Sequence, residues 1–394
     1  MRALFHLLLF SFLFLSQACL KDSDQHHNRQ AFIFDHDVVA YYQNQAVELA
    51  DSLLLLPDLS LADHSDHIFA DNPGMYVSLA CYWWPDPSSE NGLPYIRIDG
   101  EINPETRSES SHLPLLIGMA KRVEIFAAAY NITGREVFAE KAAEQLFTWF
   151  VSQETAMLPH LDHAQMVKGQ NTGRSYGVID GWWLVRVLES FDYLTHSPHW
   201  SYELETGLTN WFSDFLHWLL TGEFGLNEIK STNNHGTWYD VQIVAYSLFT
   251  GREELAKQHL MEISKKRLLK QFSPSGRQKL EMRRTRPLHY SIYNLAGQLK
   301  LAEFARLVGM EYGNHKTFFS SGLEKGTLYL IHALNGADIT ALSDPQDQTD
   351  IDGLYLYILT SAYSLYNHDV IKNEKVRYLD EQKFIHTPLL FQPI

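Results

Sequence analysis

The stretch LPLLIGMAKRVEIFAAAYNITG, residues 113–134, decides the fold of this chain because its apolar residues recur at helical spacing up to a closing glycine. The next stretch, REVFAEKAAEQLFTWFVSQ at residues 135–153, repeats the pattern at once. Gly134 between them can take the left-handed conformation that ends a helix. Two helices joined by so short a turn predict a helical hairpin.

The same rhythm continues along the chain, with Gly222, Gly251, Gly309 and Gly336 at further segment ends. Strand-like alternation is scarce. The pattern predicts a single all-α domain, an (α/α)n toroid or barrel of helical hairpins, with a helical solenoid of more similar repeats as the alternative. Further helices are expected at residues 178–197, 205–222, 237–251, 252–272, 291–309, 322–336 and 352–367.

Long insertions without helical spacing interrupt these segments and hold most of the unusual residues. Function in a helical scaffold is expected on such loops. The chain divides into a leader at 1–18, an N-terminal segment at 19–71 and a toroidal catalytic domain at 72–394. The insertions lie at residues 72–108, 155–177, 223–236, 273–290 and 337–351.

The first residues, MRALFHLLLFSFLFLSQACLKD, predict a secretory signal peptide: one arginine, an apolar run and then small residues. SQAC resembles a lipobox, so either Cys19 is lipidated or the leader is cleaved nearby. We therefore expect an exported protein, periplasmic or held at the outer membrane through Cys19. Cys81 is the other cysteine, and without Cys19 it has no partner for an internal disulfide.

The net charge of −15 argues against nucleic acid as a partner. An acidic chain that acts on an acidic substrate needs a local basic pocket. The 20 Tyr and 9 Trp are numerous, and such side chains serve both as core and as stacking platforms for sugar rings.

STNNHGTWYDVQ, residues 231–242, places two amides and an imidazole ahead of a helical segment. Asn233 or Asn234 can cap a helix that starts near Gly236. A helix N-terminus also presents free N–H groups and a partial positive charge. With Asn234 and His235 beside it, the segment predicts a site for an oxyanion or carboxylate.

GRQKLEMRRTRPLHYSIYN, residues 276–294, is the basic segment that an acidic substrate requires. Tyr290 comes directly after the basic side chains of this segment. Nearby guanidinium groups favour its phenolate, which predicts a lowered pKa and a general base. Arg286 and His289 are predicted substrate contacts. The alternative is a solvated basic loop with Tyr290 in the core. The segment's cationic and imidazole side chains are Arg277, Lys279, Arg283, Arg284, Arg286 and His289.

Two further loops carry predicted substrate contacts. In the segment at 158–183 these are Gln165, Lys168 and Arg174, long donors suited to carboxylates and hydroxyls. The alternative is a solvated loop in which Arg174 pairs with a carboxylate. In the segment at 82–105 Trp83, Trp84, Tyr95 or Arg97 is expected to face the substrate, or else the segment is a flap that packs on the barrel rim. Trp238 and Tyr239 are the other aromatic candidates.

A tunable base beside donors for a carboxylate suits β-elimination on a uronic acid. Removing the C5 proton builds negative charge on the carboxyl group, which donors must neutralise. An acid must then protonate the departing O4. One tyrosine can do both when the proton and the leaving oxygen share a face.

Four motifs carry a resemblance to a known family: NNHGTWYDVQ, RTRPLHYSIYNL, YWWPDP…GLPYIRIDG…NPE and HLDHAQMVKG…GRSYGVIDGWW. Over roughly residues 75–370 the chain resembles the alginate lyase family of bacterial exported polysaccharide lyases. It is most similar to the Bacteroidetes-type members of polysaccharide lyase family 38, and more distantly to family 5. The resemblance implies an (α/α) toroid and an anionic polyuronate as partner.

Carried over by position, the resemblance implies that Asn234 and His235 neutralise the uronate carboxylate. It implies Tyr290 as catalytic base and acid and Arg284 as the group that tunes it, with Asn233 a further candidate. Arg174 and Gln165 would line subsites. Mannuronate, guluronate and glucuronate polymers all remain open as substrates.

Two other functions stay open on the residues alone. A glycoside hydrolase would need two flanking carboxylates, for which Asp162, Asp180, Asp240 and Asp352 are available. A glycan-binding surface protein would keep the aromatics without a catalytic set. The elimination chemistry requires no cofactor and no metal.

Overall fold

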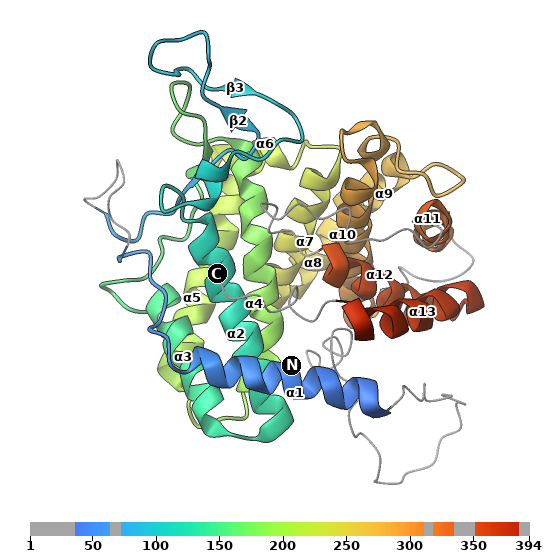
Figure 1. Cartoon of the computed structure of the whole chain (residues 1–394), viewed down its shortest axis with the longest axis horizontal. Coiled ribbons are helices and arrows are strands. Elements are labelled where there is room, and N and C mark those ends of the chain that lie inside the picture. Colours follow the sequence, from blue (N-terminus) through green and yellow to red (C-terminus); the bar gives the residue numbers. More distant parts are fainter. Residues whose placement is uncertain (1–35, 64–71, 311–317, 335–350, 386–394) are drawn as a thin grey trace.

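The computed structural model describes residues 36–63, 72–310, 318–334 and 351–385. Helices form most of this part of the chain and pack against one another, with both short turns and long loops between them (Figure 1). The predicted all-α toroid of helical hairpins is confirmed. The leader, Cys19 and the insertion at 337–350 lie outside the described residues.

The first hairpin is the one that the sequence predicted. α2 (Leu113–Thr133) and α3 (Glu136–Phe150) flank Gly134, whose φ of 66° is left-handed and whose N–H donates to the carbonyl of Tyr130 at 2.7 Å. Gly251 and Gly309 are also left-handed, with φ of 73° and 71°. Gly222 is not left-handed: its φ of −71° and ψ of 148° are extended, and the next helix begins directly after it.

The helices form an inner and an outer set. α2 packs on α4 (Trp182–Leu194), α4 on α7 (Asn234–Phe249), α7 on α10 (Pro287–Leu307) and α10 on α12 (Ile351–Tyr366). The inner helix α7 is buried along nearly its whole length. Outer helices α3 and α5 (Tyr202–Thr221) bury one face only, as amphipathic helices do.

The inner helices α7 and α10 begin earlier than predicted. α7 starts at Asn234, so Asn234 and His235 belong to its first turn. α10 starts at Pro287, which places Tyr290 in its first turn too. Both starts follow polar or basic residues that mask the helical spacing of the sequence.

Other elements were joined or missed by the sequence pattern. The segment predicted as one helix at 252–272 is α8 (Glu253–His259), a π-helical turn and α9 (Lys265–Gln271). The remaining helices are α1 (His36–Leu53), α6 (Glu223–Glu228), α11 (Phe318–Leu334) and α13 (Asp369–Ile385). Among the described residues, no helix has the length and apolar character needed to cross a membrane.

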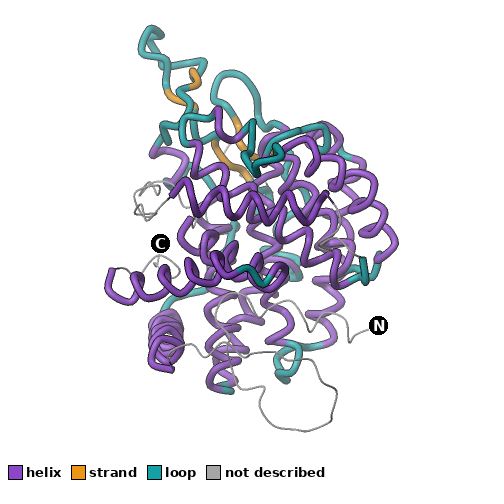
Figure 2. The backbone as a smooth tube through the Cα atoms, turned by 90° about the vertical axis from the view of Figure 1, so that its right-hand side faces the viewer, coloured by secondary structure: helices purple, strands orange, loops and turns teal. Residues whose placement is uncertain are grey.

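Short strands and loops gather at one end of the helical body (Figure 2). β1 (Val77–Leu79) pairs in parallel with β4 (His163–Met166). β2 (Trp83–Trp84) pairs antiparallel with β3 (Ile96–Arg97) and forms a flap above the helix ends. This end of the molecule therefore combines the predicted loops with the starts of α4, α7 and α10.

Candidate active site

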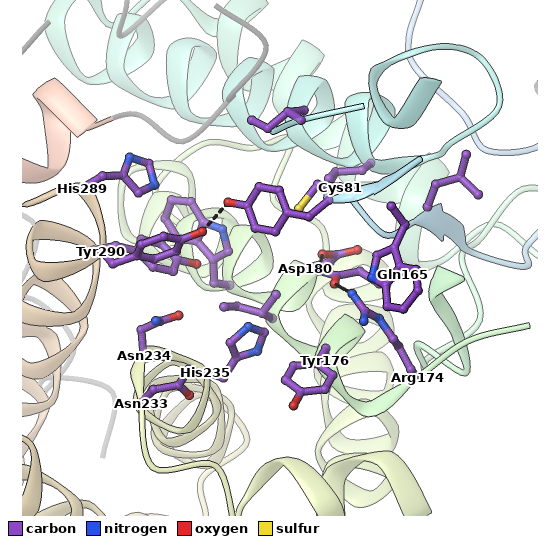
Figure 3. Close-up of a pocket in the computed structure, with 18 of the residues that line it drawn as sticks. Cys81, Gln165, Arg174, Tyr176, Asp180, Asn233, Asn234, His235, His289 and Tyr290 are labelled. Atoms are coloured by element: carbon purple, nitrogen blue, oxygen red, sulfur yellow. Dashed lines mark hydrogen bonds between the residues drawn. The ribbon is translucent and has the colours of Figure 1, made fainter. Parts of the chain in front are cut away.

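A pocket of about 520 Å³ lies where the first turns of the inner helices meet the strands and loops (Figure 3). It brings together segments far apart in the sequence: the flap, the loop after β4, and the starts of α7 and α10. Eight predicted site residues line it: Gln165, Arg174, Asn233, Asn234, His235, Arg284, His289 and Tyr290.

The pocket is basic within an acidic protein. Arg97, Arg107, Arg174 and Arg284 line it, and Asp180 is the only carboxylate among its described lining residues. The N-termini of α4, α7 and α10 also open on it, and each carries a partial positive charge. The local basic site that an anionic substrate demands is therefore present.

Tyr290 is held between two partners at the pocket surface. Its hydroxyl accepts a hydrogen bond of 2.9 Å from Nη2 of Arg284 and is hydrogen-bonded to the hydroxyl of Tyr82. Cζ of Arg284 lies 3.8 Å from the centre of the Tyr290 ring. Asp99 accepts a hydrogen bond of 3.1 Å from the same Nη2 and so fixes the guanidinium.

The expected lowering of the Tyr290 pKa is wrong for this structure. Burial raises the pKa of Tyr290 to about 12, which outweighs the opposing effects of Arg284 and of the Tyr82 hydrogen bond. The basic segment supplies one guanidinium to the phenol, not the several that the sequence suggested. The hydroxyl is therefore neutral near pH 7, and any role as a base requires it to be ionised.

Asn234 and His235 are each backed by a buried glutamate. Nδ1 of His235 lies 2.8 Å from Oε1 of Glu228, which leaves Nε2 as the ring nitrogen for the pocket. The backbone N–H and the side-chain amide of Asn234 contact the two oxygens of Glu281 at 2.8 and 2.7 Å. Glu228 and Glu281 are both only 1% exposed.

Asn233 occupies the N-cap position of α7 without a side-chain capping bond. The predicted capping role is therefore not what this amide does, and its side chain lines the pocket instead. Gly236 follows in the same turn because a Cβ there would come within 2.1 Å of both Nη1 of Arg267 and the carbonyl of Ser231. That close approach holds the loop against the start of α7.

Arg174 and Gln165 form one side of the pocket. Nη2 of Arg174 donates to Oε1 of Gln165 at 3.0 Å, and Nε2 of Gln165 donates to Asp180 at 3.1 Å. Gln165 has a φ of 49°, uncommon for a residue with a side chain and a sign of a position fixed by its surroundings. The guanidinium of Arg174 lies over Tyr176 and Trp83, with Cζ 5.1 and 5.8 Å from the ring centres.

Lys168 and Trp84 lie outside the pocket, contrary to the prediction that they contact substrate. Lys168 is paired with Glu105 and stands near the ring of Tyr95. Trp84 donates from Nε1 to the carbonyl of Glu101 at 3.0 Å within the flap. Trp84 therefore braces the flap, which was the structural alternative for the segment at 82–105, and Lys168 ties the neighbouring loop to Glu105.

Trp238, Tyr239 and Arg286 also lie outside the pocket. Trp238 and Tyr239 are 2% and 1% exposed, because α7 is an inner helix and these positions face its neighbours. Their polar atoms bond to carbonyls of Tyr293 and Leu219 at 3.2 and 3.0 Å. Arg286 precedes α10 and does not line the pocket.

Several lining or supporting residues were missed by the sequence analysis. Tyr82 and Tyr176 line the pocket, and the Tyr176 ring stands edge-on to His235 with centroids 5.1 Å apart. Glu228 is buried behind His235, and Glu281 is buried behind Asn234. Glu228 stands only seven positions before His235, so its nearness in the sequence could have suggested the contact. The contact between Tyr82 and Tyr290 spans 208 positions, and no local pattern in the sequence indicates it.

The carboxylates that a hydrolase would use are not paired across the pocket. Asp180 is buried, which raises its pKa, and it accepts hydrogen bonds from Ser78 and Tyr76. Asp240 is buried against Arg267 and His259. Asp162 and Asp352 do not line the pocket. The described part of the chain also contains no group of His, Cys, Asp or Glu side chains arranged to hold a metal ion.

The chain is similar to known alginate lyases. The family model described as alginate lyase matches residues 66–339. The crystal structure of an alginate lyase from Bacteroides ovatus is 30% identical, with a TM-score of 0.77, and the match covers 90% of this chain and 92% of that one. A variant of alginate lyase A1-III in complex with a tetrasaccharide is 16% identical, with a TM-score of 0.54 over 83% of this chain and 89% of that one, a likeness of fold alone. No curated protein matches.

Proposed function

The chain belongs to the alginate lyase family and is a polysaccharide lyase, and on that premise we propose that it cleaves a polyuronate by β-elimination with Tyr290 as the catalytic residue. The observation that carries this proposal is one pocket in which Tyr290, Arg284, Asn234 and His235 meet. A phenol with a guanidinium partner stands opposite donors for a carboxylate. Alginate, named for the relatives, is the first substrate to test.

The uronate carboxylate is bound by Asn234 and His235 at the positive end of α7. With Glu228 ionised, a protonated His235 donates from Nδ1 to the glutamate and from Nε2 to the substrate. As the C5 proton leaves, charge develops on this carboxyl group, and the same donors stabilise it more strongly.

Tyr290 carries out both proton transfers. Its phenolate oxygen, stabilised by Arg284, takes the C5 proton. The electron pair forms the C4–C5 double bond as the bond from C4 to O4 breaks. The new phenol then gives its proton to O4, which restores the phenolate.

The single phenol favours substrates in which the C5 hydrogen and O4 share a face. Mannuronate and glucuronate polymers have that arrangement, and guluronate does not. Arg174, with Tyr176 and Trp83 beside it, binds a neighbouring sugar of the chain through its charge and the aromatic faces.

The test is a panel of polymannuronate, polyguluronate and glucuronan, followed by the ultraviolet absorbance of an unsaturated uronate and by reducing ends. We expect both signals to rise together on at least one same-face polymer. Reducing ends without the absorbance would identify a hydrolase, and binding without either signal would identify a glycan-binding protein.

We also propose that the protein is exported and acts in the periplasm or at the outer membrane. The support is the leader and the Cys19 motif of the sequence. Metabolic labelling with a palmitate analogue, compared between the natural chain and Cys19→Ala, tests the lipid anchor.

A further inference from the structure

Glu281 lies directly behind Asn234 and has no part in the steps above. It is 1% exposed and sits in the short 3₁₀ turn Glu281–Arg283 before α10. Its Oε1 accepts the backbone N–H of Asn234 at 2.8 Å, and its Oε2 faces the Asn234 side-chain amide at 2.7 Å. One buried carboxyl group therefore contacts both polar ends of the residue that faces the substrate.

Because of these two contacts, the orientation of the Asn234 amide depends on whether Glu281 is protonated. Oε1 always accepts from the backbone, so only Oε2 is placed to carry a hydrogen toward the amide. When Glu281 is ionised, Oε2 accepts from Nδ2 of Asn234, and Oδ1 is then directed into the pocket, as Figure 3 shows. An amide oxygen in that position repels a uronate carboxylate.

We propose that Glu281 is protonated when substrate is bound, and that this proton turns the Asn234 amide so that Nδ2 donates to the uronate carboxylate. The protonated Oε2 then donates to Oδ1, and every buried polar atom keeps a partner. The proton comes from solvent as the uronate binds and returns when product leaves. The inference rests on the proposed function and makes Glu281 a positioning residue.

The surroundings of Glu281 favour this proton. Burial raises the pKa of Glu281, against the lowering effects of the Asn234 hydrogen bonds and of the charges on Arg284 and His235. A bound uronate brings a negative charge beside those same two side chains and offsets their effect. Substrate binding therefore raises the pKa of Glu281 further.

The pH dependence of Glu281→Gln tests the inference, because the substituted amide donates to Oδ1 of Asn234 at every pH. The ratio of kcat/KM between this variant and the natural enzyme cancels the titration of Tyr290. We expect the ratio to rise with pH by up to about tenfold per unit above the pKa of Glu281. A ratio that stays constant across the active pH range overturns the inference while leaving the lyase function intact.

A binding measurement tests it without turnover. Calorimetry of a uronate oligosaccharide with Tyr290→Phe, in buffers of different ionisation enthalpy, counts the protons taken up. We expect Tyr290→Phe to take up more protons than Tyr290→Phe with Glu281→Gln, by a difference that approaches one proton at the alkaline end. Equal uptake by both variants overturns the role of Glu281.

Absence of oligouronate binding at any pH overturns the proposed function as well. Should the double variant fail to fold, lack of uptake by Tyr290→Phe across the pH range still refutes the inference.

Discussion

Nη2 of Arg284 donates a 2.9 Å hydrogen bond to the hydroxyl of Tyr290, and the same guanidinium covers the face of the tyrosine ring. Both contacts favour the ionised phenol over the neutral one. Arg284 is itself held by Asp99 of the flap loop, so the base depends on a residue far away in sequence.

Replacement of Arg284 by Gln should lower kcat by about tenfold or more, because the phenolate loses its one cationic partner. KM should change less. Arg283→Gln is the matched control, since Arg283 is an exposed neighbour that does not line the pocket. Equal loss in both variants would mean that general charge, and not the contact with Tyr290, matters.

The phenol of Tyr290 should titrate near pH 12, since burial favours its neutral form. The difference in phenolate absorbance between the natural protein and Tyr290→Phe reports this group alone. In an Arg284→Gln background the same difference should move to still higher pH. A midpoint at or below the ordinary pKa of tyrosine would mean that the charge of Arg284 outweighs the effect of burial.

Loss of the glutamate behind His235 should lower kcat. In Glu228→Gln the negative charge that stabilises a protonated imidazole is absent, so the carboxylate loses a charged donor, and we expect a fall of about ten- to a hundredfold in kcat. His235→Ala should cost at least as much. If either variant changes only KM, the contact does not strengthen as the C5 proton leaves.

Arg174→Lys should weaken substrate binding more than turnover. A lysine keeps the charge but has no planar guanidinium to lie near the Trp83 and Tyr176 rings while donating to Gln165. We expect KM to rise about tenfold with kcat nearly unchanged. Arg135→Lys, at an exposed pair with Asp51 outside the pocket, is the control for the same exchange elsewhere.

The buried tyrosine of α7 should matter to stability alone. Tyr239→Phe removes a buried hydrogen bond to the carbonyl of Leu219, at a cost of about 1 kcal/mol in the free energy of unfolding. Chemical denaturation measures that change. A changed KM would instead show that Tyr239 contacts the substrate.

The sequence was sufficient for the helical architecture because helical spacing and closing glycines are local signals. Gly134 shows this directly, since its left-handed φ and its hydrogen bond to Tyr130 need only neighbouring residues. The starts of α7 and α10 were placed late. Polar groups in a first turn serve the pocket there and do not follow the apolar pattern.

The sequence also indicated several residues that the structure brings together in one pocket, but it did not indicate their environment. Tyr290 was expected to have a lowered pKa because charge is visible in a sequence and burial is not. Trp238 and Tyr239 were expected in the cleft because nothing local says which face of a helix meets its neighbours. Glu281 and Tyr82 escaped notice because each acts through a partner distant in the chain.

The variant Tyr290→Phe decides whether the Tyr290 hydroxyl moves the C5 proton. Formation of unsaturated uronate by this variant is compared with that of Tyr239→Phe, while oligosaccharide binding and circular dichroism show that the pocket and fold persist. We expect Tyr290→Phe to bind substrate and to lose at least about a hundredfold in turnover, whereas Tyr239→Phe keeps its turnover. A folded Tyr290→Phe that retains more than a few per cent of the natural rate would show that another group moves the C5 proton.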